Sequence, residues 1–217
     1  MDISKDDIMK NIITKIQEKK IISVVEIDDL KTIDALCETL ISTSINVIEL
    51  ALRTNVSKKA AELIVKNYPE ITIGLGTVIN IDQVKFALEV GAEFAVSPGC
   101  NPEVIDYSLK NNLPFFPGIS NPTDIEIAVN YGCTVLKFYP AEISGGIKFL
   151  EAINSPFKYL NLKYIPLGGI NNSNVLDYLK SEIILAVGGS WINTKKAIKG
   201  KKWDLIKTNA LEINKLL

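Results

Sequence analysis

One lysine interrupts the apolar run of residues 133–140, where Lys137 stands between leucine and phenylalanine. An ammonium group buried in such a run must pair with an opposite charge, lose its proton or reach water. A second apolar run, residues 45–52, is interrupted by Glu49. If both runs are β-strands, their two-residue period can turn both charges toward one interior, with Tyr139 on the same face as Lys137.

The Lys137 and Glu49 pair has two interpretations. It can be a structural ion pair without chemistry, since charge pairs also occur in protein interiors for other reasons. Alternatively, desolvation lowers the pKa of a buried amine, which then attacks a carbonyl carbon while the carboxylate moves protons. The two residues by themselves leave both interpretations open, although the second gives each charge a use.

Two further polar residues follow apolar runs at the same expected edge. Arg53 lies four residues after Glu49, where its guanidinium group could hold a carboxylate through two parallel hydrogen bonds. The third run, residues 71–76, leads directly to the hydroxyl of Thr77. The alternative for Arg53 is an ordinary surface arginine.

Paired glycines mark the ends of the last two apolar runs, as Gly168-Gly169 and as Gly188-Gly189 followed by Ser190. Glycines let backbone N–H groups approach a phosphate closely, and the loops after strands seven and eight of a (β/α)8 barrel are a common phosphate site. The alternative is that both pairs only form tight turns.

Eight short β-branched runs recur along the chain, separated by segments with helical spacing of apolar residues. Strands of such continuous apolarity indicate a parallel sheet covered by helices. An open doubly wound sheet would favour a GxGxxG motif after the first strand, and the sequence has none there. We therefore predict an α/β fold, a single-domain (β/α)8 TIM barrel over residues 1–217. An extra N-terminal helix is expected to cover its bottom. The strands are expected to begin near Ile21, Ile45, Ile71, Glu93, Pro114, Cys133, Lys163 and Ile183.

Composition excludes several classes of function. The 24 basic and 25 acidic residues give a net charge of −1, without attraction to nucleic acid or an anionic membrane. The chain has no histidine and three scattered cysteines, so neither a His-ligated metal site nor a disulfide framework is expected. No apolar run suits a signal peptide or a membrane span, and we expect a cytoplasmic protein. The basic run of residues 195–202 is interpreted as solvated surface.

With these residues identified, the sequence resembles the class I pyruvate aldolases that act on 2-keto-3-deoxy-6-phosphogluconate (KDPG) and 4-hydroxy-2-oxoglutarate (KHG). The resemblance runs from Ile21 to Trp191. It is carried by the segments IELALRT from Ile48, GLGTV from Gly74, SPG from Ser97, PGIS from Pro117, LKFYPAE from Leu136, GGI from Gly168 and GGSW from Gly188.

The resemblance implies a role for each candidate residue. Lys137 would be the Schiff-base lysine and Glu49 the general acid–base, with no cofactor and no metal. Pyruvate would be bound by Arg53 and Thr77, and the phosphorylated 2-keto-3-deoxy sugar acid would further contact Pro98, Tyr139, Gly168, Gly169, Gly188, Gly189 and Ser190. A homotrimer is expected.

Two positions depart from the family pattern at the distal end of the substrate. Leu167 stands where many members carry a hydroxyl residue, and Glu26 could place a like charge near the phosphate. We therefore expect only a modest preference for the phosphorylated substrate. Two other functions share the glycine pairs: a phosphate-binding barrel isomerase or synthase, and a non-catalytic sensor of a sugar-acid phosphate.

Overall fold

The computed structural model describes residues 4–217, and all of its paired strands are parallel. The strands form a six-stranded sheet in the order β5-β4-β3-β2-β1-β9 and a three-stranded sheet in the order β6-β7-β8. Their bounds are β1 (Ile21–Val25), β2 (Val47–Ala51), β3 (Thr72–Gly76), β4 (Phe94–Val96), β5 (Phe115–Phe116), β6 (Gly118–Ile119), β7 (Val135–Phe138), β8 (Lys163–Pro166) and β9 (Val187–Gly189).

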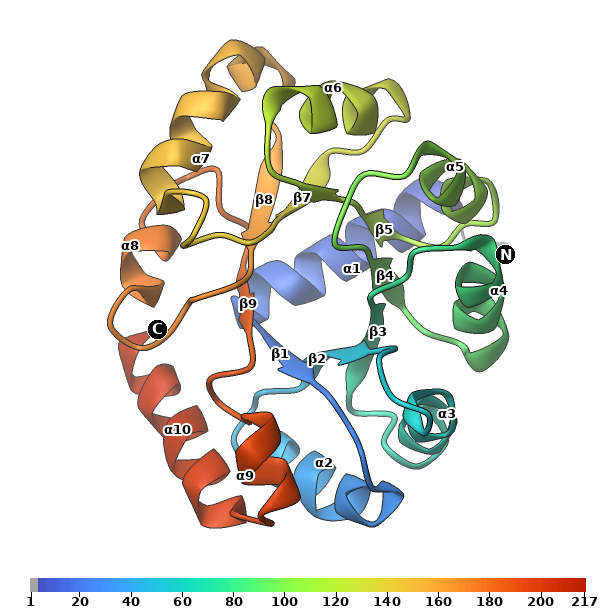
Figure 1. Ribbon diagram of the computed structural model, residues 1–217, viewed down its shortest axis with the longest axis vertical. Helices are drawn as coiled ribbons and strands as arrows, with labels where there is room; N and C mark the ends of the chain where they lie inside the picture. The colour runs from blue at the N-terminus through green and yellow to red at the C-terminus, as the bar shows by residue number, and fades with distance from the viewer. Residues whose placement is uncertain (1–3) are drawn as a thin grey trace.

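The strands occupy the centre of the molecule, and most helices surround them (Figure 1). The α-helices are α1 (Lys5–Lys19), α2 (Ile33–Ser42), α3 (Ser57–Asn67), α4 (Ile81–Val90), α5 (Pro102–Lys110), α6 (Pro122–Asn130), α7 (Gly146–Asn154), α8 (Val175–Leu179), α9 (Lys195–Lys199) and α10 (Trp203–Leu216). Two 3₁₀ helices, η1 (Leu30–Thr32) and η2 (Ser155–Leu160), complete the order. The predicted α/β class with parallel strands is confirmed, and none of the helices within residues 4–217 is long and apolar enough to cross a membrane.

Asparagine side chains fix the starts of three consecutive helices on this scaffold. The side chains of Asn80, Asn101 and Asn121 accept hydrogen bonds from backbone N–H groups in the first turns of α4, α5 and α6. Such caps satisfy N–H groups that have no partner inside the helix. Pro102 and Pro122 occupy the first helical positions, where a missing N–H is tolerated.

The fifth predicted strand is not continuous, which corrects one expectation. Pro117 separates β5, which pairs with β4, from β6, which pairs with β7. Proline lacks the N–H that a ladder requires, so the break between the two sheets falls at this residue. On the other side, two isolated parallel bridges connect β8 and the residue after it with β9 and the segment before it: Tyr164 to Ile184 and Leu167 to Gly188.

Both sheets contribute side chains to one inner core. This cluster joins Ile22, Val47, Phe94, Val96 and Phe116 of the larger sheet with Val135 and Ile165 of the smaller one. A second, larger cluster lies between the strands and the surrounding helices.

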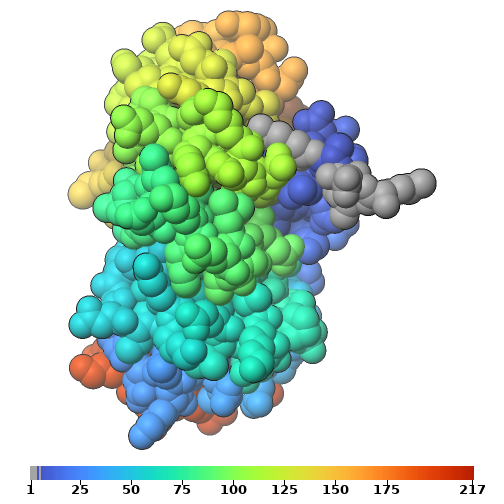
Figure 2. Space-filling model, turned by 90° about the vertical axis from the view of Figure 1, so that its right-hand side faces the viewer, coloured from blue at the N-terminus to red at the C-terminus, as the bar shows by residue number. Residues whose placement is uncertain are grey.

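The N-terminal helix that the sequence predicted is α1, and it packs into the inner core. Its residues Ile12 and Ile16 pack into the inner cluster beside Ile22 and Val47, which lie at the amino-terminal ends of their strands. Figure 2 shows the helix as the blue segment along one side of the molecule. The opposite, carboxyl-terminal ends of the strands are thereby left for a site.

Candidate active site

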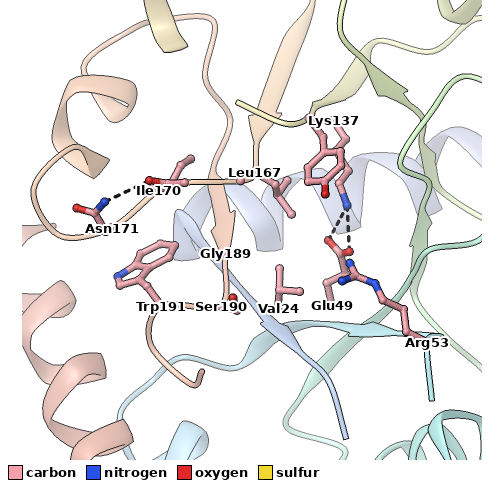
Figure 3. Close-up of a pocket in the computed structure, with 13 residues that line it drawn as sticks. Val24, Glu49, Arg53, Lys137, Leu167, Ile170, Asn171, Gly189, Ser190 and Trp191 are labelled. Carbon is pink, nitrogen blue, oxygen red and sulfur yellow. Dashed lines mark hydrogen bonds and ion pairs between the residues drawn. The ribbon is translucent and has the colours of Figure 1, made fainter. Parts of the chain in front are cut away.

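A cavity of about 480 Å³ opens at the carboxyl-terminal ends of the strands. In Figure 3, Lys137 and Glu49 point toward one another on one side of it, with Arg53 beside them, and Trp191 lies on the other side. The lining residues come from the ends of β1, β2, β7, β8 and β9 and from the loops that follow them: Val24, Glu49, Arg53, Lys137, Tyr139, Leu167, Gly168, Gly169, Ile170, Asn171, Gly189, Ser190 and Trp191.

The two charges predicted from strand alternation meet at this cavity. Lys137 Nζ donates to Glu49 Oε1 at 3.0 Å and to Oε2 at 3.4 Å. Lys137 is 4% exposed and Glu49 1% exposed, although β2 and β7 belong to different sheets. The Tyr139 ring lies over the amine, with its centroid 5.6 Å from Nζ. The prediction that both charges point into one interior is confirmed.

The neighbouring strand β3 makes room for the Glu49 carboxylate. A Cβ atom placed on Gly76 would lie 2.3 Å from Glu49 Oε1 and 2.7 Å from its Cγ. Any side chain at this position would therefore have to displace the carboxylate. The glycine belongs to the GLGT segment, where the sequence alone gives no reason for its size.

A buried Lys–Glu contact of this length can carry proton transfer. When the proton moves from Nζ to the carboxylate, the pair becomes a neutral amine and a carboxylic acid, and neither charge remains in the low-dielectric interior. The amine then has a free lone pair, and the acid holds a proton within reach of whatever the amine attacks.

Arg53 is held at the cavity mouth by Thr77. Arg53 Nε donates to Thr77 Oγ1 at 3.0 Å, and Thr77 itself has a left-handed backbone with φ of 61°. A β-branched residue rarely adopts this conformation, so the turn after β3 is strained where it presents the hydroxyl. Thr77 does not line the cavity, and its observed contact is with Arg53.

Two loops border the far end of the cavity. Gly168 and Gly169 have φ of 97° and 85°, a conformation that glycine adopts without the strain of other residues. A Cβ atom on Gly169 would also lie 2.6 Å from Glu142 Cβ. Trp191 Nε1 donates to Asn172 Oδ1 at 2.9 Å, which ties the loop after β9 to the loop after β8.

The Gly168-Gly169 turn is held by a hydrogen-bonded pair, the exposed Glu142 and the buried Tyr178. Glu142 N donates to the carbonyl oxygen of Gly168 at 3.0 Å, and the Tyr178 hydroxyl donates to Glu142 Oε1. Burial, and then this hydrogen bond, raise the pKa of the Tyr178 phenol well above its ordinary value. The phenol therefore stays protonated and remains a donor.

The structure brings most of the predicted site residues together, with three exceptions. Thr77 contacts Arg53, Pro98 is exposed in the loop after β4, and Gly188 lies under the Leu167 side chain, whose Cγ is 2.7 Å from a Cβ built on the glycine. None of the three is among the cavity's lining residues.

Sequence reasoning did not assign Val24, Ile170, Asn171 or Trp191 to the cavity. Trp191 directly follows the predicted Gly-Gly-Ser turn, which was a usable signal. Val24 and Ile170 carry no chemical signal, since apolar residues fill most strand ends in this chain.

Glu26 lies elsewhere than the sequence suggested. Its carboxylate is ion-paired with Lys195 and lies 3.7 Å from Arg53 Nη1, and it does not line the main cavity. Lys195 was interpreted as solvated surface; its side chain is exposed, and it also bridges Glu26 and Asp28. Within residues 4–217, no group of three or more His, Cys, Asp or Glu side chains is arranged to hold a metal ion.

Comparison with known proteins assigns the chain to a family. Residues 12–209 match the family model described as KDPG and KHG aldolase. The chain belongs to this aldolase family. The family resemblance inferred from the sequence is thus confirmed, and with it the class of carbon–carbon lyases.

Individual aldolases are similar over nearly their whole length. The chain is 40% identical to the 2-dehydro-3-deoxy-phosphogluconate aldolase of Haemophilus influenzae, covering 91% of this chain and 92% of the relative. It is 34% identical to the KHG/KDPG aldolase of Escherichia coli, covering 88% and 89%. The structure of KDPG aldolase from Legionella pneumophila, with pyruvate captured as a covalent carbinolamine, superimposes with a TM-score of 0.86 at 34% identity, covering 96% and 97%.

Proposed function

We propose that the protein is a class I aldolase that cleaves KDPG to pyruvate and glyceraldehyde 3-phosphate, with Lys137 as the Schiff-base nucleophile. The observation that carries the proposal is the buried Lys137 Nζ, 3.0 Å from Glu49 Oε1 in the main cavity of an aldolase-family chain. The carbinolamine named for the Legionella relative is the first covalent species on such a pathway.

The first stage joins the substrate to Lys137. The neutral amine adds to the C2 ketone carbon, and one proton moves from its nitrogen to the carbonyl oxygen to give a neutral carbinolamine. Glu49, holding a proton, donates it to the departing hydroxyl, so that water leaves and an iminium ion forms. The iminium nitrogen is a cationic electron sink that the free ketone lacks.

The second stage breaks the carbon–carbon bond. Glu49, now a carboxylate, removes the proton of the C4 hydroxyl, directly or through one water. The C3–C4 bond electrons move toward the iminium nitrogen, giving an enamine and releasing glyceraldehyde 3-phosphate. Glu49 then returns the proton to C3, and hydrolysis of the new iminium releases pyruvate and restores the amine.

Binding at the two ends of the substrate follows from the residues around the cavity. Arg53, with Thr77 at its Nε, is proposed to hold the C1 carboxylate so that C2 faces Lys137. The loops with Gly168, Gly169 and Ser190 are proposed to bind the phosphate through backbone N–H groups and a hydroxyl.

The phosphate preference is expected to be modest because Leu167, 5% exposed, brings an apolar side chain to these loops. We expect kcat/KM to favour KDPG over unphosphorylated KHG by about tenfold, equivalent to about 1.4 kcal/mol. Ser190→Ala should narrow this ratio. If kcat/KM is equal for both substrates and Ser190→Ala does not change this ratio, the glycine loops are tight turns and do not bind the phosphate.

The finer architecture belongs to the same proposal: one domain in which the two sheets close into a single (β/α)8 barrel. Three features support closure. The inner core draws on both sheets, bridges at Leu167 and Tyr164 connect β8 with the β9 segment, and only Pro117 separates β5 from β6.

The proposed assembly is a homotrimer in the cytoplasm. Light scattering should give about three times the chain mass of 23.9 kDa. The free thiols of Cys37 and Cys100 suit a reducing compartment.

Trapping with borohydride tests the proposed chemistry against the alternatives. An imine between enzyme and pyruvate is reduced to a stable secondary amine, which mass spectrometry of the intact protein detects. The aldolase should gain the mass of one reduced pyruvate per chain. A phosphate-binding isomerase or a sugar-acid-phosphate sensor would gain none, because neither forms an imine.

A further inference from the structure

A row of alternating charges continues from the active-site arginine across the molecular surface. Arg53 Nη1 lies 3.7 Å from Glu26 Oε2, the other oxygen of Glu26 accepts a hydrogen bond from Lys195 Nζ, and Lys195 also lies 3.1 Å from Asp28 Oδ2. The reaction proposed above uses Arg53 and none of the other three charges.

Glu26 can compete with the substrate for Arg53. A carboxylate is bound best when two parallel N–H groups of the guanidinium face it. Arg53 Nε already donates to Thr77, so the pair left for a substrate is Nη1 and Nη2. A Glu26 side chain that moved fully onto Nη1 would occupy one of these two nitrogens.

In the observed geometry, Glu26 does not form a close ion pair with Arg53. Charge-assisted N–H···O contacts are normally about 2.7–2.9 Å long. The Arg53 to Glu26 separation of 3.7 Å is longer, whereas Glu26 is in direct hydrogen-bond contact with Lys195. The hydrogen bond to Glu26, and then that to Asp28, raise the pKa of Lys195, so its ammonium keeps its charge at neutral pH.

Hydrogen bonds of a buried side chain connect the segment that carries Lys195 to the strand that leads to Glu26. Asn193 is 1% exposed; its side chain accepts from Ser23 Oγ at 2.6 Å and donates to the carbonyl oxygen of Val24 at 3.1 Å. These bonds join the segment just before α9 to β1, the strand that ends just before Glu26. Lys195 is therefore held within reach of Glu26 by buried contacts.

We infer that Lys195 is a positioning residue that holds Glu26 away from Arg53 and so keeps the Arg53 guanidinium free for the carboxylate of the substrate. The inference rests on the proposed aldolase function, since it requires that Arg53 bind the C1 carboxylate. It makes Glu26 and Lys195 one unit, in which each residue affects the substrate only through the other and Arg53.

A double-mutant cycle on pyruvate affinity tests the inference. The pyruvate concentration that gives half-maximal borohydride trapping is measured for the wild type, Lys195→Met, Glu26→Gln and the double variant. We expect Lys195→Met to raise this pyruvate concentration about tenfold, because Glu26 then pairs with Arg53. In the Glu26→Gln background, the same substitution should change it by less than about twofold.

Two accompanying variants sharpen the result. Lys195→Arg keeps the charge and should retain wild-type affinity. Lys196→Met removes an exposed lysine of the same helix that forms no ion pair with any residue the structure describes, and it should also be silent. In steady-state cleavage, Lys195→Met should raise KM and leave kcat within about twofold, as expected for lost binding of a carboxylate present throughout the reaction.

The possible outcomes separate the inference from the function beneath it. If Lys195→Met weakens pyruvate binding equally in the wild-type background and in the Glu26→Gln background, Lys195 acts as a general positive charge and the inference is wrong. An unchanged affinity in Lys195→Met also overturns it. If the wild type forms no pyruvate adduct at all, the proposed aldolase chemistry fails, and the inference fails with it.

Discussion

At the scale of single residues, the chemistry depends on Glu49 doing more than neutralising a buried lysine. A carboxylate that only balanced charge could be replaced by any group that satisfied the amine. The proposed cycle instead requires the same group to accept and donate protons at three successive points. Its contact with Lys137 and the space left by Gly76 both fix where those protons can go.

Glu49→Gln separates these two roles. The amide keeps the shape and can still accept a hydrogen bond from Lys137, but it cannot act as a base. We expect the turnover of KDPG to fall by roughly 10²- to 10⁴-fold while trapping of pyruvate remains detectable. Glu62→Gln, which removes an exposed ion pair with Lys59 on α3, is the matched control. Turnover that survived Glu49→Gln would return the pair to a structural role.

Arg53→Ala tests the carboxylate partner. Pyruvate should bind at least about tenfold more weakly, because a charged bidentate contact is lost, and Arg53→Lys should recover only part of the affinity. The measurement is again the pyruvate concentration at half-maximal trapping. An affinity untouched by Arg53→Ala would assign the carboxylate to another group.

Residue-level prediction succeeded where strand periodicity alone set the geometry. Lys137 and Glu49 face one another because each lies in the middle of a short strand whose alternate side chains point inward. Lys195 could not be predicted in this way, since its partner Glu26 is 169 residues away in the sequence. The role of Thr77 was visible only in part, because its contact depends on a left-handed backbone at a non-glycine residue.

At the scale of elements, strand β3 leaves room for the Glu49 carboxylate because Gly76 has no side chain. Gly76→Ala would place a methyl carbon 2.3 Å from the present position of Glu49 Oε1, too close for both atoms to stay where they are. We expect kcat to fall by at least about tenfold, because the displaced carboxylate loses its alignment with Lys137. The control is Gly99→Ala, since a Cβ there would meet nothing within 4 Å. Equal activity in the two variants would show that the carboxylate tolerates displacement.

The sequence located the elements best where strands pair within one sheet. It was less accurate where the two sheets meet, at Pro117 and before β9. The eight apolar runs located the strands, and the helical spacing of apolar residues predicted helices between them. The run from Pro114 was expected to be one strand although it contains Pro117, whose missing N–H divides it into β5 and β6. The short helix α9 was missed because its charged sequence gives no apolar face at that length.

At the scale of the whole molecule, stability and chemistry are placed at opposite ends of the strands. Helix α1 packs on the amino-terminal ends, and the cavity lies at the carboxyl-terminal ends. The parallel arrangement makes this division possible, because all strand ends of one kind lie on the same side.

Ile16→Ala tests this division. Ile16 is fully buried in the inner core, so the substitution should lower the free energy of unfolding by about 2–5 kcal/mol. The kcat of the folded fraction should stay near the wild-type value, since the substitution lies at the far end from the cavity. Urea unfolding and initial rates at low temperature measure the two quantities. A large loss of kcat with intact folding would contradict the separation.

The most direct test of the central claim is to locate the trapped pyruvate on the chain. After borohydride reduction and proteolysis, peptide mass spectrometry should find the adduct on Lys137 in the wild type and no adduct in Lys137→Ala, whose cleavage activity should also be lost. An adduct on another lysine, or one that persists in Lys137→Ala, would contradict the assignment of Lys137 as the Schiff-base nucleophile.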